Sequence, residues 1–126
     1  MKHMSKRRLF LFEWDSTSAR ERTKDLRSAG WIVQVESEDE ARGGKKVLQS
    51  LPDLVVFDLA KRPSHSRETA HGIRSYKAGR AIPMVFVDGS PEDIEKTKAK
   101  VGDAVFTTSL RLKATLHAPI EKSGGA

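Results

Sequence analysis

Apolar runs alternate along this chain with stretches whose apolar residues recur at helical spacing. The runs predict five strands, at residues 8–12, 31–35, 54–58, 82–87 and 104–106. Residues 54–57 are four apolar residues without alternation, which is typical of a strand that is buried on both faces of a parallel sheet. Asp58 then stands at the carboxyl end of that strand, the end where open α/β sheets collect their chemistry.

A stretch with helix signals follows each run. The predicted helices lie at residues 16–28, 38–49, 66–76, 91–101 and 110–116. Ser37 and Glu40 have the spacing of a capping box, and Ser90 followed by Pro91 marks the start of the fourth helix. The glycine pair at 43–44 weakens the second helix by about 1 kcal/mol per residue, so we expect that helix to be short, irregular or mobile.

Strands that alternate with helices predict a parallel sheet covered on both faces. Connections between parallel strands are right-handed, and the common solution at this size is the flavodoxin-like strand order 2-1-3-4-5. The sequence therefore predicts an α/β three-layer sandwich with a five-stranded parallel sheet.

The composition bounds the class of protein. A chain of 126 residues is expected to form a single domain over 1–126, with 1–7 a flexible start or tag remnant and 119–126 a tail. The lack of cysteine excludes a disulfide scaffold, thiol catalysis and a cysteine-ligated zinc site. No apolar run approaches the length of a membrane span, and we expect a cytoplasmic protein.

The charge balance is basic, with a formal net charge of +6. Such a balance is compatible with nucleic-acid binding. The basic residues are scattered, however, and no recognition motif with interleaved aromatic residues accompanies them. We interpret them as solvated surface and keep a basic nucleic-acid-associated module as an alternative.

Three stretches together resemble the response-regulator receiver domains, the CheY-like family of two-component signal transduction and phosphorelays. They are residues 52–59 (PDLVVFDL), Ile82-Pro83 before the fourth strand, and the Gly-Asp-Ala at 102–104 before the fifth. The resemblance extends over about residues 8–116. It implies the flavodoxin-like fold, and it puts Asp58 at the phosphoacceptor position.

The same resemblance shows where the chain departs from a working receiver. The pair of acids that binds magnesium after the first strand reads Glu13-Trp14, with Asp15 one residue later. Asp88 stands at the position of the signalling hydroxyl, and Thr108 at the position of the lysine. These changes add negative charge and remove positive charge where a phosphoryl group needs the opposite.

We therefore interpret the chain as a pseudo-receiver, a signalling domain that acts by protein–protein interaction and not as an enzyme. It is expected to need no cofactor, and the acidic pocket of Glu13, Asp15, Asp58 and Asp88 is expected to bind magnesium weakly at most. The alternative is a genuine response regulator that accepts phosphoryl on Asp58, with magnesium held by Glu13, Asp15 and Asp58.

The partner is expected to be another signalling protein or a second copy of the chain. Strand five is an edge in the predicted order, and the last helix is short for its cover. The predicted interaction face lies on that edge and the helix before it, and consists of Lys96, Lys100, Phe106, Leu110 and Leu112.

Overall fold

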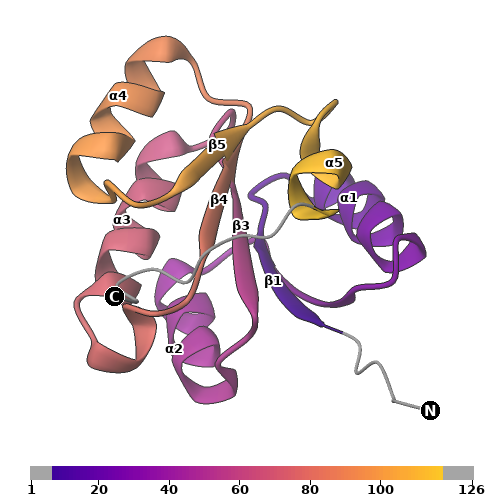
Figure 1. Ribbon diagram of the computed structural model, residues 1–126, viewed down its shortest axis with the longest axis horizontal. Helices are drawn as coiled ribbons and strands as arrows, with labels where there is room; N and C mark the ends of the chain where they lie inside the picture. Colours follow the sequence, from indigo (N-terminus) through magenta and orange to yellow (C-terminus); the bar gives the residue numbers. More distant parts are fainter. Residues whose placement is uncertain (1–6, 118–126) are drawn as a thin grey trace.

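The computed structural model describes residues 7–117 and forms one parallel sheet between two layers of helices (Figure 1). The strands are β1 (Arg8–Phe12), β2 (Ile32–Glu36), β3 (Leu54–Asp58), β4 (Met84–Val87) and β5 (Val105–Thr107). They lie in the order β2-β1-β3-β4-β5, and each pair of neighbours is parallel. The fold class and strand order predicted from the sequence are confirmed.

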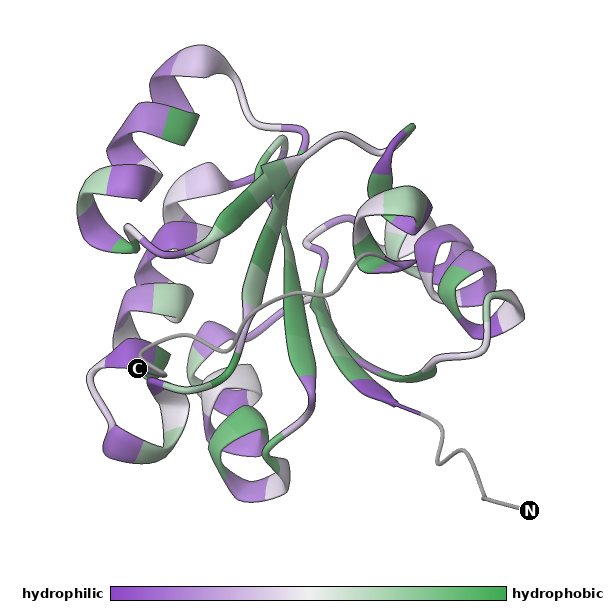
Figure 2. Cartoon of the chain, viewed as in Figure 1, coloured by the Kyte–Doolittle hydropathy of each residue, from purple (hydrophilic) through white to green (hydrophobic). Residues whose placement is uncertain are grey.

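The helices divide between the two faces of the sheet. They are α1 (Ser16–Ser28), α2 (Glu40–Ser50), α3 (Pro63–Arg74), α4 (Pro91–Lys100) and α5 (Leu112–His117), with a 3-10 turn η1 (Lys77–Gly79) after α3. Helices α1 and α5 cover one face, and α2, α3 and α4 cover the other (Figure 1). The sheet therefore separates two apolar clusters, and Figure 2 shows the strands as the most hydrophobic part of the chain.

Alternation along each strand assigns its side chains to the two clusters. In β1, Phe10 and Phe12 face α2 and α3, whereas Leu9 and Leu11 face α1 and α5. All five residues of β3 are buried, as expected for the central strand of a parallel sheet. Stacked phenylalanine rings run across the first cluster from Phe12 through Phe57 and Phe86, with centroids 5.0 and 4.8 Å apart.

Helix α2 differs from its prediction because it runs without a break through both glycines. A Cβ at Gly43 would overlap the Phe12 ring and come within 2.9 Å of Glu36 Cγ, so only glycine lets α2 approach the sheet this closely. The N-cap is Asp39, whose carboxylate accepts the Arg42 N–H at 3.0 Å, and not Ser37. The expectation of an irregular helix was wrong because tertiary packing outweighs the local cost of glycine.

The starts of two further helices, α3 and α5, differ from their predictions. Helix α3 starts at Pro63, three residues before its predicted start, because proline at the first helical position lacks an N–H that would have no partner there. Arg62 precedes it in the left-handed region, with φ of 49°. Helix α5 starts at Leu112 and not at residue 110, which leaves Leu110 almost fully exposed in the preceding turn.

Candidate functional site

Asp58 ends β3 at the carboxyl edge of the sheet, between β1 and β4. Its side chain is buried, and its Oδ2 accepts the backbone N–H of Lys61 at 2.7 Å. Burial raises the pKa of the Asp58 carboxyl, while the Lys61 N–H and the charge of Arg22 oppose that shift. One oxygen of the carboxylate is therefore already engaged by the loop that leads to α3.

Glu13 follows β1 directly and is fully buried beside Asp58. Its backbone N–H donates to the carbonyl of Glu36 at 3.2 Å, which extends the pairing of β1 with β2 by one bond. Its Oε1 accepts the Nε–H of Arg22, also at 3.2 Å, whereas its Oε2 has no hydrogen-bond partner within residues 7–117. Burial, and then the charge of Asp58, raises the pKa of Glu13 to about 7.

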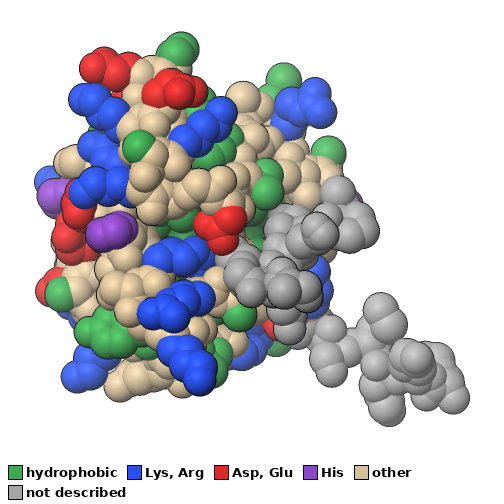
Figure 3. All heavy atoms as spheres, turned by 60° about the vertical axis from the view of Figure 1, so that its left-hand side comes forward, with side chains coloured by type: hydrophobic (Ala, Val, Ile, Leu, Met, Phe, Trp, Pro, Cys, Tyr) green, Lys and Arg blue, Asp and Glu red, His purple; other side chains and the backbone are tan. Residues whose placement is uncertain are grey.

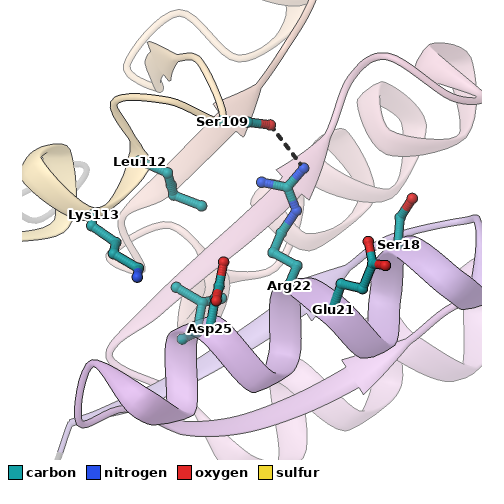
Figure 4. Close-up of a pocket in the computed structure, with 8 residues that line it drawn as sticks. Ser18, Glu21, Arg22, Asp25, Ser109, Leu112 and Lys113 are labelled. Carbon is teal, nitrogen blue, oxygen red and sulfur yellow. Dashed lines mark hydrogen bonds between the residues drawn. The ribbon is translucent and has the colours of Figure 1, made fainter.

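Arg22 supplies the positive charge of this cluster. It lies on α1, and its guanidinium donates to Glu13, donates to Ser109 Oγ at 3.1 Å and lies 3.8 Å from Asp88 Oδ2. Figure 4 shows the side chain rising from α1 toward Ser109. One cation thus links the ends of β1, β4 and β5.

The sequence reasoning did not find Arg22, although a signal was present. Residues 19, 23 and 26 of α1 are buried, and a helical face that includes those positions also includes position 22. A charged residue on the inner face of a helix indicates a buried partner of opposite charge.

Asp88 follows β4 and adopts a left-handed backbone, with φ of 64°. Its backbone N–H donates to the Thr107 carbonyl at 3.0 Å, and its Oδ1 accepts the Ser109 N–H at 2.7 Å. The Ser109 hydroxyl donates to Asp88 Oδ2 as well. Asp88 therefore links the end of β4 to the turn that leads into α5.

The other predicted site residues lie at the margin of this cluster. Thr108 is exposed, and its hydroxyl oxygen accepts the Arg111 N–H at 3.3 Å within the turn before α5. Asp15 is the N-cap of α1 and accepts the Ser18 N–H at 2.8 Å, a bond that lowers the pKa of its carboxyl. The geometry thus brings Glu13, Asp58 and Asp88 together through Arg22, with Asp15 held by its own helix.

Trp14, which the resemblance puts at the position of the second magnesium-binding acid, is buried. Its indole N–H donates to Ser66 Oγ at 2.9 Å, and the Ser66 hydroxyl donates to the backbone carbonyl of Asp58. His65 packs its ring edge-on against the indole, with centroids 5.5 Å apart. Trp14 therefore fixes the start of α3 against the end of β3.

The arrangement of the acidic side chains bears on the prediction that magnesium binds weakly at most. Magnesium prefers several oxygen ligands in octahedral geometry. Within residues 7–117 no group of three or more acidic, histidine or cysteine side chains is arranged to hold a metal. The Arg22 guanidinium lies against Glu13, and it supplies positive charge there without a metal.

A cavity of about 210 Å³ lies between α1 and α5 and reaches Arg22 from outside (Figure 4). Acidic and basic side chains both line it, so it has no single charge preference. The lining residues are Ser18, Glu21, Arg22, Asp25, Leu26, Ser109, Leu112 and Lys113.

The residues of the predicted interaction face have different surroundings. Lys96 and Lys100 are exposed and pair with Glu92 at 3.4 Å and Glu68 at 2.9 Å. Figure 3, which brings the side of α3 and α4 forward, shows basic and acidic side chains close to one another on this side. Leu110 is 95% exposed.

The two remaining residues of that face, Phe106 and Leu112, are partly or fully buried. Phe106 is half-buried and stacks on Phe86, while Lys98 lies over its ring at 5.7 Å. Leu112 is buried in the cluster beneath α1 and α5. Leu110 and the edge of Phe106 are therefore the apolar groups that this face offers to a partner.

Solved structures of receiver domains resemble this chain over most of its length. Chemotaxis protein CheY4 from Vibrio cholerae superposes with a TM-score of 0.75 at 16% identity, over 90% of this chain and 98% of that one. The receiver domain of sensor histidine kinase PA1611 from Pseudomonas aeruginosa, which has a magnesium ion coordinated in its active-site cleft, gives 0.74 at 16% identity over 90% and 93%.

A third similar structure is a two-component response regulator of the LuxR family from an Aurantimonas species, with a TM-score of 0.70 at 18% identity over 90% and 81% of the two chains. No protein-family model matches the chain, and no curated protein does. The chain therefore has the CheY-like fold of response-regulator receiver domains, at identities that establish the fold alone. Within residues 7–117 no helix is long and apolar enough to cross a membrane.

Proposed function

We propose that this chain forms a cytoplasmic pseudo-receiver domain that acts by binding another protein, and that Asp58 is not phosphorylated. The observation that carries the proposal is the place of Arg22. Its guanidinium lies between Glu13 and Asp88, where a receiver positions the cation and the phosphoryl group. Arg22 thus puts one positive charge among these carboxylates from within the chain.

The chemistry of phosphoryl transfer supports the same proposal. Transfer to a carboxylate needs a cation that contacts both the acids and the phosphoryl oxygens. Arg22 is the cation beside Glu13, but Ser109 and Asp88 also engage it, and Asp88 adds a negative charge that would repel the phosphoryl oxygens. Asp58 itself is poorly suited as a nucleophile because its pKa is raised by burial and its Oδ2 is bonded to Lys61.

Because Asp88 bonds Ser109, we expect the β4–α4 and β5–α5 turns to keep one conformation. In a receiver these turns change when the hydroxyl and lysine move toward the phosphoryl group. Here the Asp88 carboxylate accepts the Ser109 N–H at 2.7 Å and holds the two turns together. A partner that recognises this arrangement would bind without a phosphorylation signal.

The second candidate is a genuine response regulator. It is favoured by one observation, namely that Asp58 ends the central strand beside Glu13, at the carboxyl edge of the sheet. Lys61 is also close enough to this edge to donate to Ser18 Oγ at 3.1 Å, so a second cation is available in the loop.

Chemical phosphorylation separates the two candidates. The protein is treated with acetyl phosphate and magnesium, the acyl phosphate is trapped with borohydride, and the site is read by mass spectrometry. We expect no modification of Asp58 in the wild type. The matched positive control is the variant Trp14→Asp with Asp88→Thr and Thr108→Lys, which restores the receiver's acid, hydroxyl and lysine. Substantial labelling of wild-type Asp58 that is lost in Asp58→Asn would favour the second candidate.

A further inference from the structure

The outer edge of β2 has free pairing positions. In the parallel pair with β1, the Ile32 N–H donates to the Arg7 carbonyl and the Glu36 carbonyl accepts from Glu13, so alternate residues from Ile32 point toward β1. The backbone groups of Val33 and Val35 therefore point away from the sheet. Among the described residues no strand lies beyond them, because β2 is the first strand in the order.

One of these outward groups is already capped. Arg27, on α1, donates from Nη2 to the carbonyl of Val33 at 2.9 Å. A charged side chain over an edge strand limits how another strand can pair with it. The groups of Val35 lie beyond this cap, toward the carboxyl end of β2. An added strand would therefore pair with the backbone of Val35, and the Arg27 side chain over Val33 would limit its extension.

A groove runs beside that open end. Val33 is covered by α1 and is 4% exposed, whereas Val35 on the same face is 39% exposed. The groove between α1 and this part of β2 has a volume of about 680 Å³. Its lining is three cations, four hydroxyl residues and two small or branched apolar residues, namely Arg20, Lys24, Arg27, Ser16, Thr23, Ser28, Ser37, Ala19 and Val35.

The charged side chains that line this groove are all positive, because the cations and the acids of α1 lie on different faces of the helix. Arg20, Lys24 and Arg27 follow each other at spacings of four and three residues and all line the groove. The acids Glu21 and Asp25 line the opposite side of α1, toward α5, as Figure 4 shows. Within the described part of the chain, no carboxylate lines the groove itself.

We propose that this edge binds an extended acidic segment of a partner protein as a sixth strand next to β2. The backbone of the segment pairs with the outward N–H and C=O of Val35. The side chains of the segment that face α1, at every second position, pack on Ala19 and Val35 and place carboxylates along Arg20 and Lys24. Strand addition of this kind takes affinity from main-chain hydrogen bonds and specificity from the pockets beside the edge.

A peptide fits this groove better than a nucleic acid does. None of the described lining residues is aromatic, so bases would have no stacking platform. The free groups of Val35 match another backbone, and its apolar side chain matches a branched one. This proposal of strand addition rests on the proposed function, in which the domain binds another protein. The groove itself does not include Asp58. Phosphorylation of Asp58 would overturn the proposed function and leave the role of this groove standing.

The test is selection from a displayed library of random peptides of about eight residues, long enough to span β2. Wild type, Lys24→Glu and the control Lys46→Glu are screened in parallel; Lys46 is an exposed lysine on α2, outside the groove. We expect wild type and Lys46→Glu to enrich the same peptides, with Asp or Glu and branched residues together occupying every second position. The best peptide should bind Lys24→Glu about tenfold more weakly.

A backbone-methylated copy of the best peptide then tests the pairing. Two methylated peptides are made, one with N-methyl groups at the odd positions and one at the even positions. Each keeps the charge and loses half of the backbone donors. Binding should fall about tenfold for the peptide whose methyl groups face β2 and little for the other. No enrichment over Lys24→Glu, or equal binding of both methylated phases, would overturn the proposal. Tighter binding of a single-stranded oligonucleotide than of any selected peptide, lost in Lys24→Glu, would also overturn it and assign the groove to nucleic acid.

Discussion

The Arg22 guanidinium lies 3.2 Å from the carboxylate of Glu13, so the helix that follows β1 returns a cation to the end of β1. Glu13 is almost fully buried and Arg22 is 16% exposed at its side chain. A buried carboxylate in the middle of a sheet edge needs either a proton or a positive charge beside it. Arg22 provides a positive charge from within the chain, and it offsets only part of the burial that raises the pKa of Glu13 to about 7.

Removing Arg22 should therefore destabilise the fold most where Glu13 is ionised. We expect Arg22→Met to lower the free energy of unfolding by about 2 kcal/mol at pH 8, because it leaves a buried charge without its partner. The loss should be smaller at pH 5, where Glu13 holds a proton in either protein. Urea unfolding at the two pH values measures the difference.

The matched control for that experiment is Arg20→Met, which removes a cation from the exposed side of the same helix. It should change the unfolding free energy by less than about 0.5 kcal/mol. Equal losses in the two variants, or a loss for Arg22→Met that does not grow with pH, would show that Arg22 does not neutralise Glu13.

Glu13 itself should give the protein an unusual dependence on pH. Its folded-state pKa of about 7 lies above the ordinary value of 4.5, so the folded protein binds the proton more tightly than the unfolded chain. Stability from this group is complete below about pH 4.5 and is lost as the pH rises to 7, by about 3 kcal/mol in total. Above that range its contribution is constant.

Comparison of wild type with Glu13→Gln isolates this effect. Glutamine cannot ionise, so the difference in unfolding free energy between the two proteins should move by about 2.5 kcal/mol in favour of the Glu13→Gln variant as the pH rises from 5 to 8. Glu36 acts in a separate range, because its bond to Arg42 lowers its pKa to about 2 and its stabilisation is lost only below pH 4.5. A difference that is flat from pH 5 to 8 would contradict the raised pKa of Glu13.

The sequence predicted the sheet because its strands are short apolar runs whose order allows few topologies. It placed Asp58 at the end of the central strand for the same reason. It did not predict Arg22, because the partners of that side chain come from β1, β4 and the turn after β5, and their proximity depends on the finished fold. Local signals succeeded in part: the cap at Ser90 was predicted correctly, whereas the capping box at Ser37 was not, because Asp39 caps α2.

The glycine pair of α2 is a second case in which the effect of a residue depends on tertiary packing that the local sequence does not reveal. Helix propensity treats Gly43 and Gly44 as equal, and the sequence therefore predicted a weak helix. The structure makes them different: Gly43 lies against Phe12 and Glu36, whereas a Cβ at Gly44 would meet nothing within 4 Å. The close approach of α2 to the sheet cannot be inferred from local sequence.

Alanine at the two positions should consequently have opposite effects. Gly44→Ala should raise the free energy of unfolding by up to about 1 kcal/mol, because alanine favours the helix and has space. Gly43→Ala should lower it by about 1–3 kcal/mol, because overlap with the Phe12 ring outweighs the gain in helix propensity. Thermal unfolding of both variants measures the two shifts, and equal signs would contradict the packing argument.

The face around β5 gives the last prediction. Leu110 is 95% exposed in the turn before α5, and the half-buried Phe106 lies on the adjacent edge strand. An exposed leucine beside a short edge strand can anchor a second copy or a partner, and edge strands are usually covered. We expect the protein to self-associate through this face, and we expect Leu110→Glu to weaken the association at least about tenfold.

Sedimentation equilibrium measures the effect. Leu112→Glu is unsuitable, because Leu112 is 4% exposed and its replacement would disturb the core. Lys96→Glu is a useful second variant, since it replaces an ion pair with Glu92 by a like-charge contact on α4. Tyr76→Glu is the control, because Tyr76 is 60% exposed in the segment between α3 and η1, outside this face. A strict monomer in wild type, with no partner captured through Leu110, would remove β5 as an interaction edge and leave the groove beside β2 as the candidate binding surface.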